Sequence, residues 1–298
     1  MTGRRWVRQF WAVLFLTSLL ATLAQAGNTA RERLLTFTPE QFRSLQASAR
    51  HGDRSAAAML GVAYENGILA PQDMSEAIMW YRKAAPGNAE VQHHLGRIYE
   101  EGRGVAADPA EAFAWYFKAA SQGDPAAQCD VARLYRSGIG TTRSLQQAAK
   151  WYEVAARQGD AQSQSNIGYM YEHGEGVAHD DAQALLWYRK AAEQGYSIAQ
   201  QNLGLMYLQG RGVQPDSRQA LYWFERAAAQ GFTPALINAA LIYMHGSNLP
   251  HDFARAHELL QKAVAAGDES ARPLLKQCLQ RLAGAGTANA EADVPKLP

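Results

Sequence analysis

The chain has 298 residues, of which 47% are hydrophobic and 19% are charged, so most of it can fold around a hydrophobic core. Its formal net charge of +1 at pH 7 gives no electrostatic basis for binding nucleic acid. The length allows one or two compact domains, or one elongated array of repeats.

Residues 1–26 have the pattern of a secretory signal peptide. Three arginines precede an apolar run from Phe10 to Leu23, and Ala24-Gln25-Ala26 then supplies a small-x-small cleavage site. The run is shorter than the roughly 20 residues that span a membrane comfortably. We therefore expect cleavage near Ala26 and no membrane span in the mature chain. Retention of residues 1–26 as an N-terminal anchor is the alternative.

Residues 27–51 are expected to form a linker and a capping helix. The sequence Thr38-Pro39-Glu40-Gln41 has the signature of a helix start, with a capping side chain followed by proline at the first helical position. Phe42, Leu45 and Ala49 follow at helical spacing and are expected to face inward.

A repeat of about 36 residues runs through the next part of the chain. Five aromatic dipeptides are separated by 35, 36, 36 and 36 residues: Trp80-Tyr81, Trp115-Tyr116, Trp151-Tyr152, Trp187-Tyr188 and Trp223-Phe224. Glycines from Gly52 to Gly267 keep the same interval, as do tyrosines from Tyr64 to Tyr243. Several independent markers in phase indicate a repeat architecture rather than a compact domain.

Each repeat has the pattern of two helices. In the fourth repeat, Asp160 is a candidate N-cap, and Gly174 supplies the left-handed residue that ends the helix. A second helix begins at Asp180, carries the Trp-Tyr pair, and ends at Gly195. Glycine or alanine at fixed positions is expected to let the two helices approach closely, with the aromatic side chains filling the gap that remains.

One such helix pair cannot bury both of its faces, so stacked repeats must share a continuous core. The sequence therefore predicts an all-α protein with six two-helix repeats over residues 52–267 and a C-terminal capping helix over residues 268–282. Residues 283–298 are rich in Ala, Gly and Asn and are expected to be disordered.

The repeat from Ala199 to Asp216, continued from Ala220 to Gly231, resembles a Sel1-like repeat, a relative of the tetratricopeptide repeat. The resemblance implies a right-handed α-solenoid and covers residues 52–267. The third repeat departs from the pattern with Thr141-Thr142-Arg143-Ser144. The sixth departs with Ser247-Asn248-Leu249 and replaces Trp-Tyr by Leu259-Leu260.

The residues that could carry chemistry are better explained by structure. The Gly-x-Gly segments follow predicted helices and lack the Gly-Lys-Ser/Thr of a phosphate-binding loop. The pair His93-His94 does not have a metal-ligand spacing. Cys129 and Cys278 lie on helices four repeats apart and should not be bonded, because a disulfide needs Cα atoms within about 7 Å. We expect no catalytic residues, no metal and no cofactor.

In the tetratricopeptide relatives the first helix of each repeat lines a concave groove, so the resemblance implies a protein-binding surface there. The residues in this phase vary from repeat to repeat, whereas their neighbours recur. They are charged in the earlier repeats and more apolar in the later ones. The candidate protein-binding residues are Glu90, Arg97, Glu101, Arg133, Arg136, Tyr169, Glu172, His173, Leu205, Leu208, Gln209, Leu241, Met244 and His245.

Similarity to exported bacterial Sel1-like proteins implies a non-enzymatic periplasmic protein that binds and inhibits a partner. An immunity protein against a type VI secretion lipase effector is the leading form of this hypothesis. A periplasmic scaffold for polysaccharide export or secretion machinery is the alternative. A hydrolase acting on β-lactam or cell-wall substrates is a remote one, because some penicillin-binding members hold each helix pair with a disulfide that this chain lacks.

Overall fold

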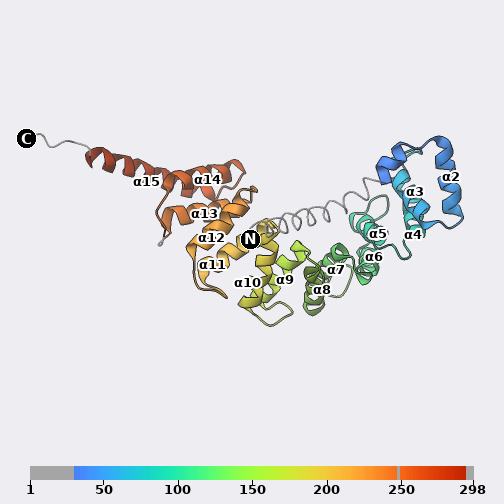
Figure 1. Ribbon diagram of the computed structural model, residues 1–298, viewed down its shortest axis with the longest axis horizontal. Helices are drawn as coiled ribbons and strands as arrows, with labels where there is room; N and C mark the ends of the chain where they lie inside the picture. The colour runs from blue at the N-terminus through green and yellow to red at the C-terminus, as the bar shows by residue number, and fades with distance from the viewer. Residues whose placement is uncertain (1–29, 247–248, 293–298) are drawn as a thin grey trace, which may run out of the picture. The chain divides into compact units, whose positions relative to one another are not determined.

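The computed structural model describes residues 30–246 and 249–292 (Figure 1). The predicted signal peptide and residues 293–298 of the predicted tail lie outside these ranges. All the elements of the described residues are helices, and none of those helices is long and apolar enough to cross a membrane. The chain divides after Thr142 into two compact units, called unit 1 and unit 2 below.

The predicted N-terminal capping helix is α2 (Pro39–Arg50). Thr38 accepts the backbone N–H of Gln41, and the Gln41 side chain accepts the N–H of Thr38, which completes a capping box. Phe42 and Ala49 are buried, as expected. A short helical segment at residues 30–35 precedes α2.

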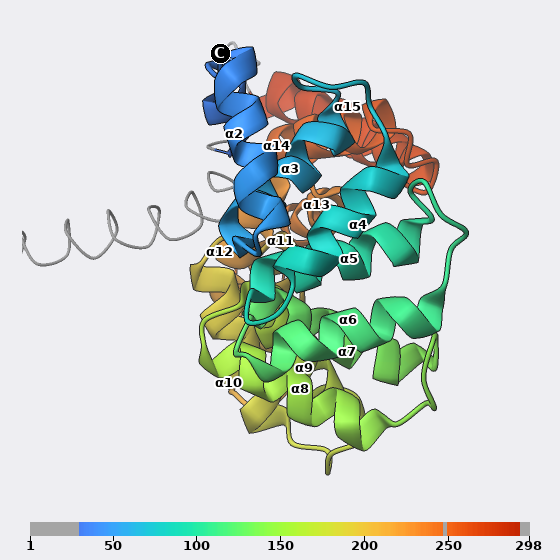
Figure 2. The same cartoon turned by 90° about the vertical axis from the view of Figure 1, so that its right-hand side faces the viewer.

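Twelve repeat helices follow within the described residues, as predicted. In unit 1 they are α3 (Arg54–Asn66), α4 (Met74–Ala84), α5 (Ala89–Glu101), α6 (Pro109–Ser121) and α7 (Pro125–Ser137). In unit 2 they are α8 (Leu145–Arg157), α9 (Ala161–His173), α10 (Asp181–Glu193), α11 (Ser197–Gln209), α12 (Ser217–Ala228), α13 (Thr233–His245) and α14 (Phe253–Ala265). Odd-numbered helices are the first helix of each repeat. Within each unit, consecutive helices pack against one another (Figure 2).

The predicted caps account for the helix boundaries. Asp160 accepts the N–H of Ser163 at the start of α9, and Gly174 ends that helix in the left-handed conformation with φ of 66°. Ser144 caps α8 by accepting the N–H of Gln147. The third repeat therefore keeps a capping side chain although serine replaces the usual aspartate.

Small residues on the first helix receive the aromatic ring of the second, which confirms the predicted packing. A Cβ atom added to Gly96 would lie 2.5 Å from the ring of Tyr116, and one added to Gly204 would lie 2.6 Å from the ring of Phe224. Such distances are too short for any side chain, so glycine is needed for this helix pair to approach so closely.

The second glycine of each Gly-x-Gly segment has a role that sequence reasoning missed. Gly212, at φ of 65°, lies against the first residue of α10 in the preceding repeat, where an added Cβ would be 2.5 Å from the carbonyl oxygen of Asp181. Gly176 meets Leu145 at the start of α8 in the same way. This glycine therefore joins consecutive repeats.

The Trp-Tyr series lies mainly in the core. Trp187 is 6% exposed and Tyr188 is completely buried. Trp80 and Trp223 are also buried, whereas Trp115 and Trp151 are partly exposed. Lysine ammonium groups lie over three of the indole rings, for example Lys190 at 4.2 Å from the centre of the Trp187 ring. The indoles are therefore covered rather than available to stack on a ligand.

The C-terminal helix α15 (Ala271–Ala292) packs on α14 and continues ten residues past the expected end at Leu282. Cys278 lies on the buried side of α15 and donates its thiol to the carbonyl oxygen of Phe253. Neither Cys278 nor Cys129 forms a disulfide, and both are buried.

Candidate protein-binding surface

One side of every first helix stays outside the core. In α5 this side carries Glu90, His94, Arg97 and Glu101, which are exposed or half-buried. Their spacing of three or four residues keeps them on one face. Residues 198, 202, 205 and 209 of α11 occupy the same positions three repeats later. We call this side the free face of the first helices, and it contains most of the predicted binding residues.

In unit 1 the predicted charged residues largely pair with one another. Arg97 lies 3.6 Å from Glu101, and Glu101 also pairs with Arg103 at 2.8 Å. Arg133 donates to Glu100 at 2.8 Å and to Asp130 at 3.0 Å. Glu90 is exposed and Arg136 is half-buried. Much of the charge on this surface is therefore neutralised within the unit.

Glu65, a half-buried carboxylate that was not predicted, joins several groups of unit 1. Glu65 accepts the hydroxyl of Tyr81 at 2.6 Å and the guanidinium of Arg103 at 2.8 Å, and it lies 2.9 Å from His94 Nε2. Burial by itself would raise the pKa of Glu65, but the contacts from His94, Tyr81 and Arg103 lower it to about 2. The three partners come from three different helices or loops, so the carboxylate joins two repeats.

The same arrangement recurs in unit 2. Glu172 accepts the hydroxyl of Tyr188 and pairs with Arg211 at 2.6 Å, and Arg211 also reaches Asp181 at 2.9 Å. Burial and the nearby Glu172 carboxylate both raise the pKa of Tyr188. Glu172 was predicted as a binding residue, but its contacts make it a link between repeats.

In the fifth repeat this network is replaced by apolar residues. Leu208 stands where three of the other repeats have Glu65, Glu100 and Glu172, and Phe224 stands where those three repeats have tyrosine. The Leu208 side chain is 40% exposed, and Ile198 on the same helix is 43% exposed. An exposed leucine at a position that forms a half-buried ion pair in three other repeats is a candidate for an apolar contact.

The remaining predicted residues of unit 2 lie around Leu208. Leu205 and Leu241 are half-buried, and Leu205 packs against the core that contains α13. Tyr169 stacks on His173, with ring centres 4.0 Å apart. Gln209 and His245 are exposed. The free face of α9, α11 and α13 therefore has an apolar middle with polar neighbours.

Met244 must be removed from the candidate surface. It is 1% exposed and lies in the same core cluster as Leu260, which replaces the tyrosine of the other repeats. The Glu-Tyr pair of the fourth repeat thus becomes a Met-Leu pair in the sixth, and both members are buried. The paired substitution in the sequence was the signal that could have identified Met244 as a core residue.

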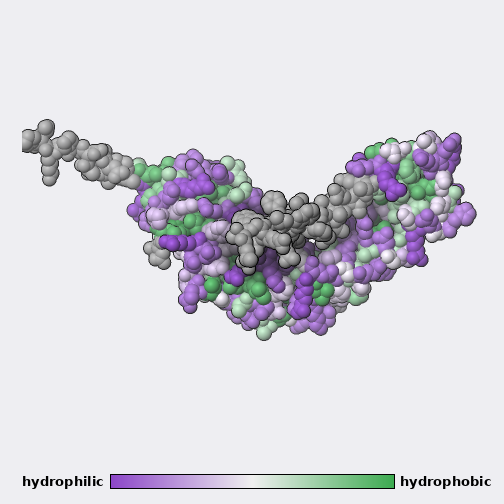
Figure 3. All heavy atoms as spheres, viewed as in Figure 1, coloured by the Kyte–Doolittle hydropathy of each residue, from purple (hydrophilic) through white to green (hydrophobic). Residues whose placement is uncertain are grey.

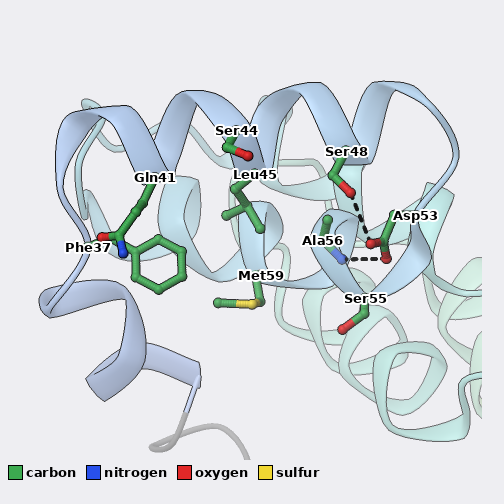
Figure 4. Close-up of a pocket in the computed structure, with 9 residues that line it drawn as sticks. All are labelled: Phe37, Gln41, Ser44, Leu45, Ser48, Asp53, Ser55, Ala56 and Met59. Atoms are coloured by element: carbon green, nitrogen blue, oxygen red, sulfur yellow. Dashed lines mark hydrogen bonds between the residues drawn. The ribbon is translucent and has the colours of Figure 1, made fainter.

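A separate cleft lies between α2 and α3, with a volume of about 340 Å³. Leu45 points from α2 toward Met59 on α3, and Ser44, Ser48 and Ser55 lie along its length (Figure 4). The only carboxylate, Asp53, already accepts the Ser48 hydroxyl and the Ala56 N–H. No group in this cleft is arranged for catalysis.

Across residues 30–246 and 249–292, no group of three or more His, Cys, Asp or Glu side chains could hold a metal ion. His93 lies 2.8 Å from Asp130, and His94 is engaged with Glu65. On the face drawn in Figure 3, hydrophilic residues surround separate hydrophobic patches in both units.

Repeated helix pairs, a core shared between neighbouring repeats and a free face of variable residues define an α-solenoid of the binding type. A family model described as Sel1 repeat matches residues 54–85, 89–124, 125–160, 161–196, 197–232 and 233–268. The chain therefore belongs to the Sel1 repeat family, as the sequence resemblance predicted. Proteins of this family generally act as interaction scaffolds.

Two crystal structures are similar in sequence and fold. A protective antigen of uropathogenic Escherichia coli with an SLR fold is 32% identical, with a TM-score of 0.74, over 86% of this chain and 58% of the antigen. This chain thus matches little more than half of that protein. A Sel1 repeat protein from Oxalobacter formigenes is 30% identical, with a TM-score of 0.66, over 81% of this chain and 96% of that one.

An immunity protein from Pseudomonas aeruginosa aligns at 22% identity and a TM-score of 0.41, over 82% of this chain and 88% of that one. This similarity is too low to support a shared function. A comparison with curated proteins found no match.

Proposed function

We propose that this chain is an exported, non-enzymatic protein that binds a partner protein through the free face of its first helices, with the centre of the contact in unit 2. The observation that carries the proposal is Leu208. Three other repeats place at this position a glutamate that accepts a tyrosine hydroxyl and a guanidinium. The fifth repeat instead leaves a leucine 40% exposed beside the half-buried Leu205.

The usual distribution of apolar and polar side chains in tight interfaces supports the proposal. Tight interfaces place apolar side chains at a centre from which water is excluded and polar side chains at the rim. Leu205, Leu208 and Leu241 would form the centre here, and Gln209, His173 and His245 would form the rim.

Affinity purification with the mature chain, followed by binding measurements on the protein recovered, tests this proposal. Leu208→Arg and Leu205→Arg should each weaken binding by about 2 kcal/mol or more, because each places a charge in a desolvated centre. The matched control is Leu186→Arg in α10, since Leu186 is also 40% exposed but lies on a second helix. Equal binding by Leu208→Arg and the parent chain would place the contact elsewhere.

The finer form of the proposal is inhibition of the partner. The resemblance to exported Sel1-like proteins favours an immunity protein that neutralises a secreted lipase effector in the periplasm. Recovery of a lipase whose activity falls on binding would support this form. Recovery of a polysaccharide-export or secretion component would favour the scaffold instead. Hydrolysis of a β-lactam or of cell-wall fragments by the purified chain would contradict the non-enzymatic assignment.

A further inference from the structure

The cleft between α2 and α3 lies where α2 has shorter side chains than the helices of the repeats. Ser44 and Ser48 of α2 correspond to Met79 and Lys83, which stand 35 residues later on α4. Five of the six second helices of the repeats have lysine or arginine at the position of Ser48. The two serines leave a cleft of about 340 Å³, within the range of about 300–1,000 Å³ in which proteins hold small ligands.

The side-chain amide of Gln41 has a fixed orientation in this cleft. Its oxygen accepts the N–H of Thr38 at 2.7 Å in the capping box. Its NH2 group is therefore the end that lies beside the ring of Phe37 (Figure 4). Within the described residues this NH2 group has no hydrogen-bonding partner. A ligand at this end of the cleft meets a hydrogen-bond donor and no competing acceptor.

The rest of the lining combines apolar side chains with hydroxyl groups. Leu45 and Met59 are half-buried and point toward each other, and Ala56 is 4% exposed. Ser44 and Ser55 place hydroxyl groups beside these apolar side chains (Figure 4). Neither hydroxyl has a partner within the described residues. A ligand here meets apolar surface and neutral hydrogen-bonding groups side by side.

The charges of the lining exclude several classes of ligand. Among the described residues that line the cleft there is no lysine, arginine or histidine to pair with a phosphate or a carboxylate. Asp53 already accepts the Ser48 hydroxyl and the Ala56 N–H, so its oxygens are not free for a cation. A purely apolar chain would deprive the Gln41 NH2 group of water without replacing it, which is costly. The lining fits an uncharged ligand that has both polar groups and apolar faces.

We propose that this cleft binds an uncharged oligosaccharide that carries N-acetylated amino sugars. A sugar ring has C–H groups on its faces and hydroxyl groups at its edges. The C–H groups would lie on the electron-rich face of the Phe37 ring, and the hydroxyl groups would pair with the serines. The acetamido carbonyl would accept the Gln41 NH2 group, and the acetamido methyl would lie on Leu45 and Met59.

The size and the position of the cleft limit the ligand further. Its volume is at the lower end of the range for ligand sites, so it holds one or two sugar rings. A short contact in an open cleft gives a dissociation constant on the order of 1 mM. The cleft lies in unit 1 and shares no residue with the proposed protein contact in unit 2, so the two proposals are independent.

Nuclear magnetic resonance of the full mature chain, labelled with carbon-13 in the methionine methyl groups, tests this proposal. Titration with N,N′-diacetylchitobiose should shift the methyl resonance of Met59, which Met59→Leu would assign. Cellobiose has the same glycosidic linkage without acetamido groups. It should bind at least about fivefold more weakly, because it lacks one hydrogen bond and one methyl contact.

Gln41→Glu separates the ligand contact from the structural role of this residue. Glutamate also accepts the Thr38 N–H in a capping box, so the variant keeps the helix start and loses only the NH2 group. It should weaken chitobiose binding about three- to tenfold at an unchanged melting temperature. Gln219→Glu is the matched control, because Gln219 is an exposed glutamine at the same third position of α12. Ser44→Met, with the side chain of the next repeat, should fill the cleft and abolish binding.

Three results would overturn the proposal: no shift of the Met59 methyl resonance with chitobiose, equal binding of cellobiose, or unchanged binding by Gln41→Glu. A shift produced by octanoate but not by the sugar would identify an acyl-chain site and would also overturn it. Leu208→Arg should bind chitobiose as the parent chain does. Failure of the sugar site and failure of the contact in unit 2 are therefore distinguishable.

Discussion

At the scale of single residues, the position of Glu65 and Leu208 on the first helices is occupied in two different ways. The glutamate after the repeat tyrosine is half-buried and bonded in the first, second and fourth repeats, and it joins neighbouring repeats there. The leucine at this position in the fifth repeat forms no such link and faces solvent. The amino acid found here therefore decides whether a repeat uses this position as a link to its neighbour.

The low pKa of Glu65 predicts an acid-sensitive contribution to stability. Its ordinary value of 4.5 falls to about 2 in the folded chain. Between these pH values the unfolded chain binds a proton that the folded chain does not, so stability is lost as the pH falls from 4.5 toward 2. We expect a loss of roughly 2 kcal/mol after allowance for solvent screening.

Urea unfolding at several pH values would measure this loss. Glu65→Gln should make the free energy of unfolding less dependent on pH in this window, whereas Glu193→Gln, an exposed residue of α10, should not. An unchanged slope in Glu65→Gln would show that the carboxylate does not stabilise the fold in this way.

Trp187 tests the assignment of the aromatic series to the core. Trp187→Ala should lower the free energy of unfolding by about 3–5 kcal/mol, the range for removing a large buried aromatic side chain. Tyr222→Ala, at a side chain 47% exposed, should cost about 0.5 kcal/mol or less. Chemical denaturation would measure both. Unchanged stability with weakened partner binding in Trp187→Ala would instead identify the tryptophans as a binding ladder.

At the scale of helices, a ladder of buried glutamines joins the repeats. The Gln200 amide at the start of α11 donates to the carbonyl oxygen of Ala192 at the end of α10, and its own oxygen accepts the amide of Gln230 after α12. Gln164 makes the same contacts with Ala156 and Gln194. Each glutamine thus adds a second hydrogen bond to a carbonyl group at the end of the preceding helix, which also accepts the backbone N–H of Gly195 or Gly159.

Adjacent glutamines provide a matched test of this ladder. Gln200→Leu should lower the free energy of unfolding by about 1–3 kcal/mol, because it removes two hydrogen bonds made by a side chain that is 1% exposed. Gln201→Leu should be neutral or stabilising, since the side-chain oxygen of Gln201 already lacks a partner. Thermal unfolding of the two variants would measure both changes in stability. Equal destabilisation would show that volume rather than hydrogen bonding sets the cost.

At the scale of the whole molecule, pairs of residues that bond to each other in earlier repeats are replaced together in the fifth and sixth repeats. The glutamine ladder ends in the sixth repeat, where Leu236 replaces the first glutamine and Ala266 the second. The Glu-Tyr pair becomes Leu208 with Phe224 in the fifth repeat and Met244 with Leu260 in the sixth. Replacing one partner alone would leave a buried polar group unsatisfied, whereas replacing both costs little.

The candidate surface was predicted only in part. Its location on the first helices and its apolar character in the later repeats followed from the positions that vary between repeats. The ion pairs of Glu172 and Arg133 were not predicted, because their partners lie 39 and 33 residues away in neighbouring repeats. The burial of Met244 was not predicted, because the sequence of one helix shows that this position varies but does not show which residue of another helix packs against it.

The sequence by itself determined the period, the twelve repeat helices, their caps and the aromatic core. These features depend on local backbone preferences and on a pattern repeated six times, and both can be recognised without knowing how the repeats stack. Only the tertiary structure decided the contact of the second glycine with the preceding repeat, the links through Glu65 and the glutamines, and which leucines remain exposed. Those properties depend on how closely neighbouring helices approach, and the order of residues along one helix does not specify that distance.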